Sequence, residues 1–147
     1  MNVRSLVLEN SGVVMLARDD DTWCVATPER LREVAYWPAT VGSMWTPPLL
    51  PNAMSLIEEH TPGDVPGESW WVLHGSAEPE VQIAVTLEDG SSPMVHRLGS
   101  VWAVEWVSIP QSAFVYRSDR PEGNQPDRIR MIRPSYLPPA PYPDNHW

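Results

Sequence analysis

Alternation of apolar and polar side chains between residues 70 and 117 constrains the fold of this chain more than any other feature. Residues 81–87 alternate with a period of two, which gives a strand one apolar face. The same signals predict further strands, separated by turns, over 70–76, 94–98, 101–107 and 112–117. We therefore expect a mainly β fold, either an antiparallel β-sandwich or a partly open barrel. Because the chain lacks a Cys…Trp…Cys spacing, this sandwich is immunoglobulin-like in shape only.

The N-terminal part predicts three short strands followed by one or two short helices. The strands are expected over 3–8, 13–17 and 22–26. Thr27-Pro28-Glu29 is typical of a helix start, and Pro38 ends that helix. A second short helix is expected over 52–59. The alternative is an α+β fold, in which the three strands form a meander packed by the first helix.

Proline divides the chain. Six of the 17 prolines lie in 38–66 and seven in 121–143, where we expect regular structure to lapse. The predicted organisation is a single mainly β domain over 1–135, with a potential sub-division into 1–60 and 68–118. Residues 119–147 form a proline-rich C-terminal arm in this prediction, with one further strand expected over 129–133.

Charge excludes several classes of partner. The 147 residues include 19 acidic and 10 basic residues, every basic residue is Arg, and the formal net charge is −9. We therefore expect neither nucleic-acid binding nor docking on an anionic membrane. The chain has one cysteine, no signal-peptide pattern at its start and no apolar run of about 18 residues, the length that spans a bilayer. A cytoplasmic protein is the resulting expectation.

No motif predicts a catalytic centre or a cofactor. His74 and His96 lie in expected strands and could meet Glu105 across a sheet, which makes these three residues weak candidates for a metal site or an acid/base pair. No HxH, HExxH or CxxC spacing supports a metal, so we expect no metal and no cofactor. Cys24 has no cation or helix start beside it and is expected to be a buried structural thiol.

Tryptophan is abundant, with eight residues against four Tyr and one Phe. Trp70 and Trp71 are adjacent, so in a strand they point to opposite faces. Trp102 and Trp106 share a face with Val104, and we expect one of these two sets to lie outside if the other lies inside. Tryptophan that is exposed beside proline often marks a binding surface, because it is enriched in interface hot spots.

The leading hypothesis is a non-catalytic, acidic protein-binding module, such as an inhibitor, immunity or accessory protein. Its partner is expected to carry a basic surface, since opposite charge speeds encounter. The interface candidates are four tryptophan anchors and four acidic rim residues, namely Trp37, Trp45, Trp70, Trp71, Glu58, Glu59, Asp64 and Glu68. The alternatives are a carbohydrate-binding β-sandwich, a structural subunit of a larger assembly, and a small enzyme using His74, His96 and Glu105. The sequence predicts no oligomeric state.

Overall fold

Three antiparallel sheets make up the fold in the computed structural model, which describes residues 3–36, 54–59, 69–120 and 125–130. The N-terminal sheet has the order β1 (Val3–Val7), β2 (Val14–Arg18) and β3 (Trp23–Ala26). The central sheet has the order β4 (Met54–Glu59), β5 (Ser69–Ser76), β8 (Val101–Ser108) and β7 (His96–Leu98). The outer sheet has the order β10 (Asp127–Arg130), β9 (Ser112–Arg117) and β6 (Ile83–Leu87). The helix α1 spans Pro28–Tyr36.

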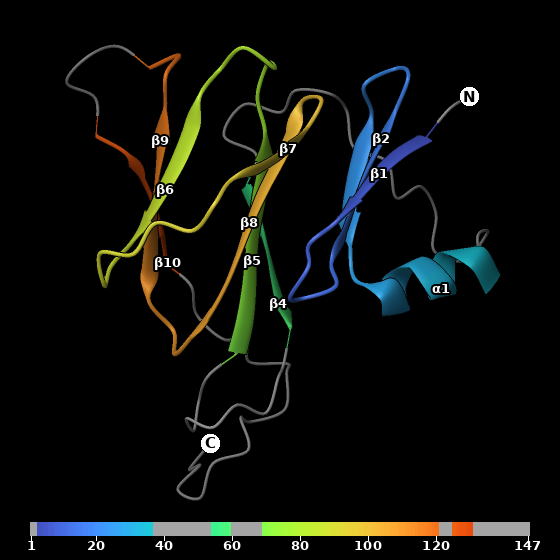
Figure 1. The fold of residues 1–147 in the computed structure, drawn as a ribbon, viewed down its shortest axis with the longest axis horizontal. Coiled ribbons are helices and arrows are strands. Elements are labelled where there is room, and N and C mark those ends of the chain that lie inside the picture. Colours follow the sequence, from blue (N-terminus) through green and yellow to red (C-terminus); the bar gives the residue numbers. More distant parts are fainter. Residues whose placement is uncertain (1–2, 37–53, 60–68, 121–124, 131–147) are drawn as a thin grey trace, which may run out of the picture.

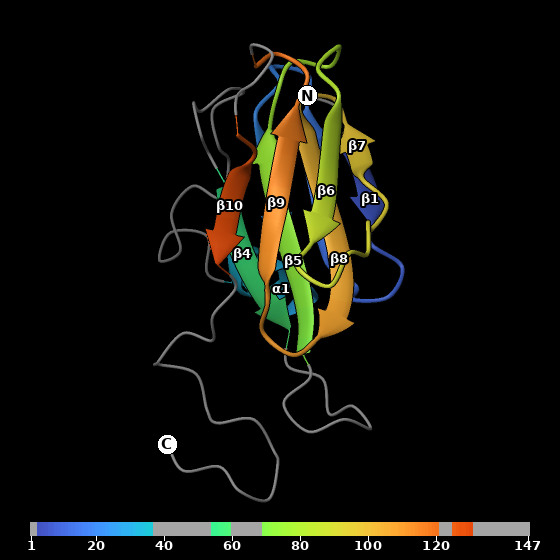
Figure 2. The same ribbon diagram turned by 90° about the vertical axis from the view of Figure 1, so that its left-hand side faces the viewer.

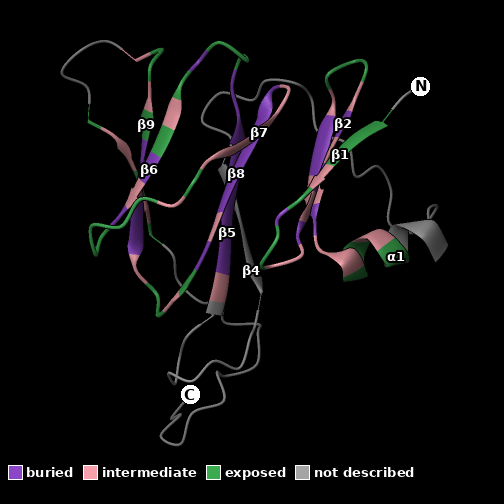
Figure 3. Ribbon diagram, viewed as in Figure 1, coloured by how far each residue is buried: buried purple, intermediate pink, exposed green. Residues whose placement is uncertain are grey.

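The sheets are stacked as three layers, with the central sheet between the other two (Figures 1 and 2). The mainly β expectation is confirmed, and the sheets do not close into a barrel. One hydrophobic core lies between the central and outer sheets and includes Trp71, Trp102 and Val85. A second core lies between the central and N-terminal sheets and includes Val72, Met15 and Trp23. The two middle strands of the central sheet, β5 and β8, are therefore buried on both faces along most of their length (Figure 3).

Burial on both faces explains the composition of β5 and β8. Each strand is an almost continuous apolar run, which is the pattern of strands covered on both sides. The expectation that one tryptophan set lies outside is wrong, because the register pairs Trp71 with Trp106 and so puts Trp71 on the same face of the central sheet as the other set. Trp71, Trp102 and Trp106 all lie in the core next to the outer sheet, and none is more than 7% exposed.

The three strands expected at the N-terminus form a meander that serves as one layer of the β stack. The turn between β1 and β2 is closed by two backbone hydrogen bonds between Leu8 and the Gly12–Val13 segment. Gly12 has a φ of 77°, a conformation that glycine adopts without steric cost. Thr27 caps α1, since its Oγ1 accepts a hydrogen bond from the backbone N–H of Arg30 at 3.2 Å.

The second predicted helix, over 52–59, is wrong. Residues 54–59 form β4, which pairs along the whole of its length with β5. Met-Ser-Leu-Ile-Glu-Glu has neither a clear helical stripe nor a strict alternation, so local propensity does not decide its structure. The ladder that β5 offers decides it, because tertiary pairing overrides weak propensity.

The segment predicted as a C-terminal arm, 119–147, contributes a strand. β10 pairs with β9 and places Ile129 against the core of the outer sheet. Residues 131–147 lie outside the described residues. Among the helical residues that the structure does describe, no helix is long and apolar enough to cross a membrane.

Candidate functional site

The predicted interface residues fall into three groups. Trp71 is 1% exposed and donates its Nε1–H to the carbonyl oxygen of Ser108 at 2.9 Å. It is a core residue, so we do not retain it as a surface anchor. Trp70 is half-buried. Glu58 and Glu59 lie on β4, where the register pairs them with Trp71 and Trp70. Trp37, Trp45, Asp64 and Glu68 lie outside the described residues.

An apolar patch surrounds Trp70 at one end of the central sheet. Trp70 pairs directly with Val107 of β8, and paired residues share a face of the sheet. Val107 is 42% exposed, and Ile109, which follows β8, is 54% exposed. We call Trp70, Val107 and Ile109 the Trp70 patch. It lies on the face that the N-terminal sheet covers further along the strands.

Glu105 marks the border between the covered and uncovered parts of this face. Its carboxylate accepts hydrogen bonds from Asn10 N–H at 3.0 Å, from Asn10 Nδ2 at 3.0 Å and from Ser11 N–H at 2.7 Å. Partial burial by itself would raise the pKa of Glu105, but the hydrogen bonds from Ser11 and Asn10 outweigh it and lower the pKa. A charged carboxylate therefore ties the β1–β2 turn to β8, beside the exposed Glu9.

The two strand histidines share a face but do not meet. The register pairs both His74 and His96 with Ala103, so β8 separates them by roughly 9–10 Å of backbone. Glu105 lies two residues further along β8, and Asn10 and Ser11 occupy its carboxylate. Among the described residues, no three His, Cys, Asp or Glu side chains gather closely enough to hold a metal ion.

His74 is buried in the core between the central and N-terminal sheets. It is 6% exposed, and the edge of its ring meets Trp23, with ring centroids 5.8 Å apart. Its Nδ1 has no hydrogen-bond partner among the described residues. Burial lowers the pKa of His74 to about 4, because the buried ring loses the water that would stabilise its charged form.

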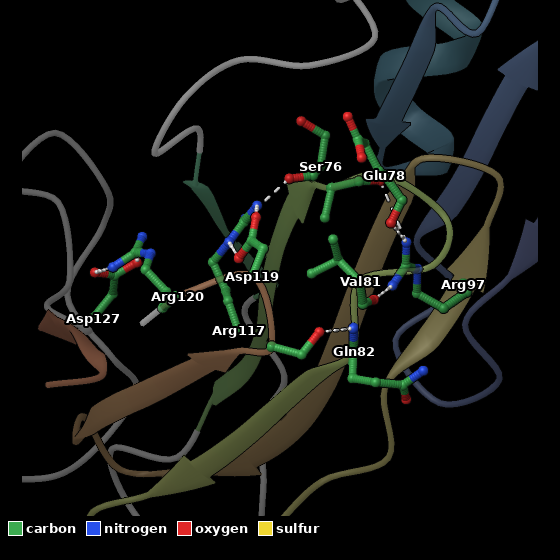
Figure 4. Close-up of polar contacts among 11 residues, drawn as sticks. Ser76, Glu78, Val81, Gln82, Arg97, Arg117, Asp119, Arg120 and Asp127 are labelled. Atoms are coloured by element: carbon green, nitrogen blue, oxygen red, sulfur yellow. Dashed lines mark hydrogen bonds and ion pairs between the residues drawn. The ribbon is translucent and has the colours of Figure 1, made fainter. Parts of the chain in front are cut away.

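Three arginines, Arg97, Arg117 and Arg120, take part in the polar cluster shown in Figure 4. Arg97 donates to the carbonyl oxygens of Val81 at 2.7 Å and Glu78 at 3.2 Å. Arg117 donates to the carbonyl oxygen of Ser76 at 3.2 Å and forms an ion pair with Asp119 at 3.0 Å. These bonds hold the loop between β5 and β6 against both neighbouring sheets. The guanidinium groups satisfy main-chain oxygens, so this cluster supports the fold.

Arg120 completes the cluster. It forms a two-fold hydrogen-bonded ion pair with Asp127, at 2.9 and 2.8 Å, which fixes the start of β10. Cys24 is buried as expected, and burial raises the pKa of its thiol while Arg30 opposes the rise. A raised thiol pKa leaves little thiolate, the reactive form.

The outer face of the outer sheet was not predicted as a site. Arg128 pairs with Phe114, and Phe114 pairs with Thr86, so these residues form one row across three strands. Tyr116, which is 46% exposed, and Arg130, also exposed, lie on the same face. The alternation of Asp127–Arg130, with Ile129 facing inward, was the signal in the sequence that points to this face.

Comparison with known proteins adds no relative. No protein-family model matches the chain, no curated protein matches it, and no solved structure matches it. Function is therefore inferred from the residues and their arrangement.

Proposed function

We propose that this chain is a non-catalytic protein-binding module, an inhibitor, immunity or accessory protein, and that it binds a partner with a basic surface. The observation that carries the proposal is the Trp70 patch. Trp70 pairs with the exposed Val107, and the exposed Ile109 follows directly after β8. Large apolar side chains of this kind supply desolvated anchors at interfaces.

Charge around the patch supports the basic character of the partner. Glu9 is exposed in the turn that Glu105 holds, and the register places Glu59 opposite Trp70. The net charge of −9 attracts a cationic surface over a distance of about one Debye length, roughly 8 Å at physiological salt. A cytoplasmic location, in keeping with a single buried thiol, is part of the same proposal.

The other functions have weaker support. A carbohydrate platform needs exposed tryptophan, yet Trp23, Trp71, Trp102 and Trp106 are each at most 7% exposed. A small enzyme that uses His74, His96 and Glu105 would require these groups to converge, and the geometry keeps them apart. A structural subunit would differ from a binding module by forming an obligate, stoichiometric complex.

The test compares partner capture by three forms of the tagged full chain. The wild type, the Val107→Asp/Ile109→Asp variant and a control, Val3→Asp/Val7→Asp, are incubated with native lysate, and the bound proteins are quantified by mass spectrometry. The control changes two apolar residues on β1 that are at least as exposed on average as the patch residues. Circular dichroism melts establish that all three forms are folded.

We expect the wild type and the control to retain a basic protein in stoichiometric amount. The patch variant should lose this protein, and moderate salt should release it from the other two forms. Retention of the same protein by the patch variant would overturn the proposal, and so would the absence of any stoichiometric partner.

A further inference from the structure

A second surface lies on the opposite side of the stack from the N-terminal sheet. It is the outer face of the outer sheet, which faces the viewer in Figure 2. Six residues line it, namely Ala84, Thr86, Phe114, Tyr116, Arg128 and Arg130. Ala84 of β6 pairs with Tyr116 of β9. The two aromatic residues lie on β9, and the two arginines lie on the neighbouring strand β10. This surface is separate from the Trp70 patch. That patch lies on the face of the central sheet that points toward the N-terminal sheet.

The arginines on this face lack acidic partners among the described residues. Arg128 donates its Nε–H to Ser112 Oγ at 3.2 Å, and Arg130 makes no ion pair there. Arg117 and Arg120, in contrast, are paired with Asp119 and Asp127. In a chain with 19 acidic and 10 basic residues, two arginines on one face of β10 with no carboxylate partner in the described part of the chain form a local cationic strip.

The position of the strip on an edge strand indicates what fits it. β10 is the last strand of the outer sheet, and its backbone groups on the side away from β9 pair with no described strand. Arg128 and Arg130 are two residues apart, which is about 6.6–6.8 Å along a strand. A peptide in extended conformation presents alternate side chains at that same interval.

We propose that β10 binds an extended acidic peptide of a partner protein, which adds to the outer sheet as a further strand. Backbone hydrogen bonds to the edge of β10 supply affinity, and carboxylates at alternate positions of the peptide meet Arg128 and Arg130. Phe114 and Tyr116 add a flat apolar platform beside them. A nucleic acid fits less well, because the net charge of −9 opposes a polyanion and the cationic strip holds two arginines.

The test begins with a displayed library of random peptides, selected on the folded full chain. Selection is repeated on Arg128→Glu/Arg130→Glu and on a control, Arg4→Glu/Arg32→Glu, which reverses the same number of exposed charges elsewhere. We expect wild type and control to enrich peptides with Asp or Glu at alternate positions. We expect the Arg128/Arg130 variant to bind those peptides about ten-fold or more weakly, as the loss of two exposed ion pairs implies.

Strand addition has its own signature. Only every second amide of the peptide points at β10, so N-methylation of one alternate set should abolish binding, while methylation of the other set should leave it unchanged. The proposal is overturned if selection yields no alternating acids, if the Arg128/Arg130 variant binds as tightly as the wild type, or if the two methylated peptides behave alike. Sedimentation that shows self-association, lost in the same variant, would identify a second copy as the occupant and would also overturn it.

Discussion

A single buried histidine links the stability of this protein to pH. The Nδ1 of His74 has no partner among the described residues, and burial lowers the pKa to about 4 from an ordinary value of 6.5. Between these values the unfolded chain binds a proton that the folded chain does not, so stability falls as the pH decreases through this window. The native state thus excludes the charged form of this ring.

We expect the free energy of unfolding to fall by about 2 kcal/mol between pH 7 and pH 5 on account of His74. Urea unfolding at a series of pH values measures it, and His74→Phe should remove this part of the dependence while it keeps the aromatic contact with Trp23. A slope that is the same in both proteins would contradict the assignment.

Glu105 is the second residue with a measurable role, because its carboxylate satisfies two backbone donors of the β1–β2 turn. Glu105→Gln should cost about 1–3 kcal/mol, since a charge-assisted acceptor is lost and the part-buried N–H of Ser11 keeps only a neutral partner. Glu9→Gln, which alters an exposed carboxylate of the same turn, serves as the control and should change stability by less than about 0.5 kcal/mol. Equal stability losses in the two variants would count against the tether.

At the scale of the element, the cap of α1 depends on one hydroxyl. Thr27 Oγ1 accepts from the N–H of Arg30, and the carbonyl oxygen of Thr27 accepts from the N–H of Leu31. We expect Thr27→Ala to weaken the first turn of α1 by about 1 kcal/mol and Thr27→Ser to preserve it. Hydrogen exchange at the Arg30 amide reports this directly, and unchanged protection in Thr27→Ala would show that the cap contributes little.

The elements differ in how far the sequence predicts them. The strands over 81–87, 101–107 and 112–117 were predicted because alternation and turn residues act locally. β4 was not, because residues 54–59 become a strand through pairing with β5, a partner that local sequence does not reveal. The almost continuous apolar run of β5 is typical of a strand buried on both faces, and therefore of a third layer. The predicted two-layer sandwich left this pattern unexplained.

The candidate surfaces were predictable only in part, for the same reason. Trp70 was chosen for its residue type, whereas Val107 and Ile109 join it through the pairing of β5 with β8. Arg128 and Arg130 were not chosen, because their cationic strip arises from their place on an edge strand and from the absence of an acidic partner among the described residues. A sequence does not show either property.

At the scale of the whole molecule, both cores depend on the central sheet. Val72 and Ala103 face the N-terminal sheet, while Leu73 and Val104 face the outer sheet. Loss of one outer layer would expose an apolar face of the strands that also support the other layer. The stack should therefore unfold as one cooperative unit.

Two probes, one in the N-terminal sheet and one that includes the core beside the outer sheet, test this cooperativity. Cys24 lies in the N-terminal sheet and is buried, so labelling of its thiol reports the opening of that sheet. Trp71, Trp102 and Trp106 lie in the core beside the outer sheet and contribute to the tryptophan fluorescence, together with the other tryptophans of the chain. We expect the two urea transitions to share one midpoint, and earlier labelling of Cys24 would show that the N-terminal sheet opens separately.

The order of the layers along the chain has a consequence during synthesis. The meander over 3–26 leaves the ribosome first, but the surface that covers its inner face comes from Val72, Val101 and Ala103. At roughly 5–20 residues per second, the nascent meander waits about 4–15 s for that surface to be translated. Throughout this interval Leu8, Val13 and Met15 have no native contact with the central sheet, so the newborn chain depends on chaperones, or on a low local concentration, to reach the moment when β8 emerges.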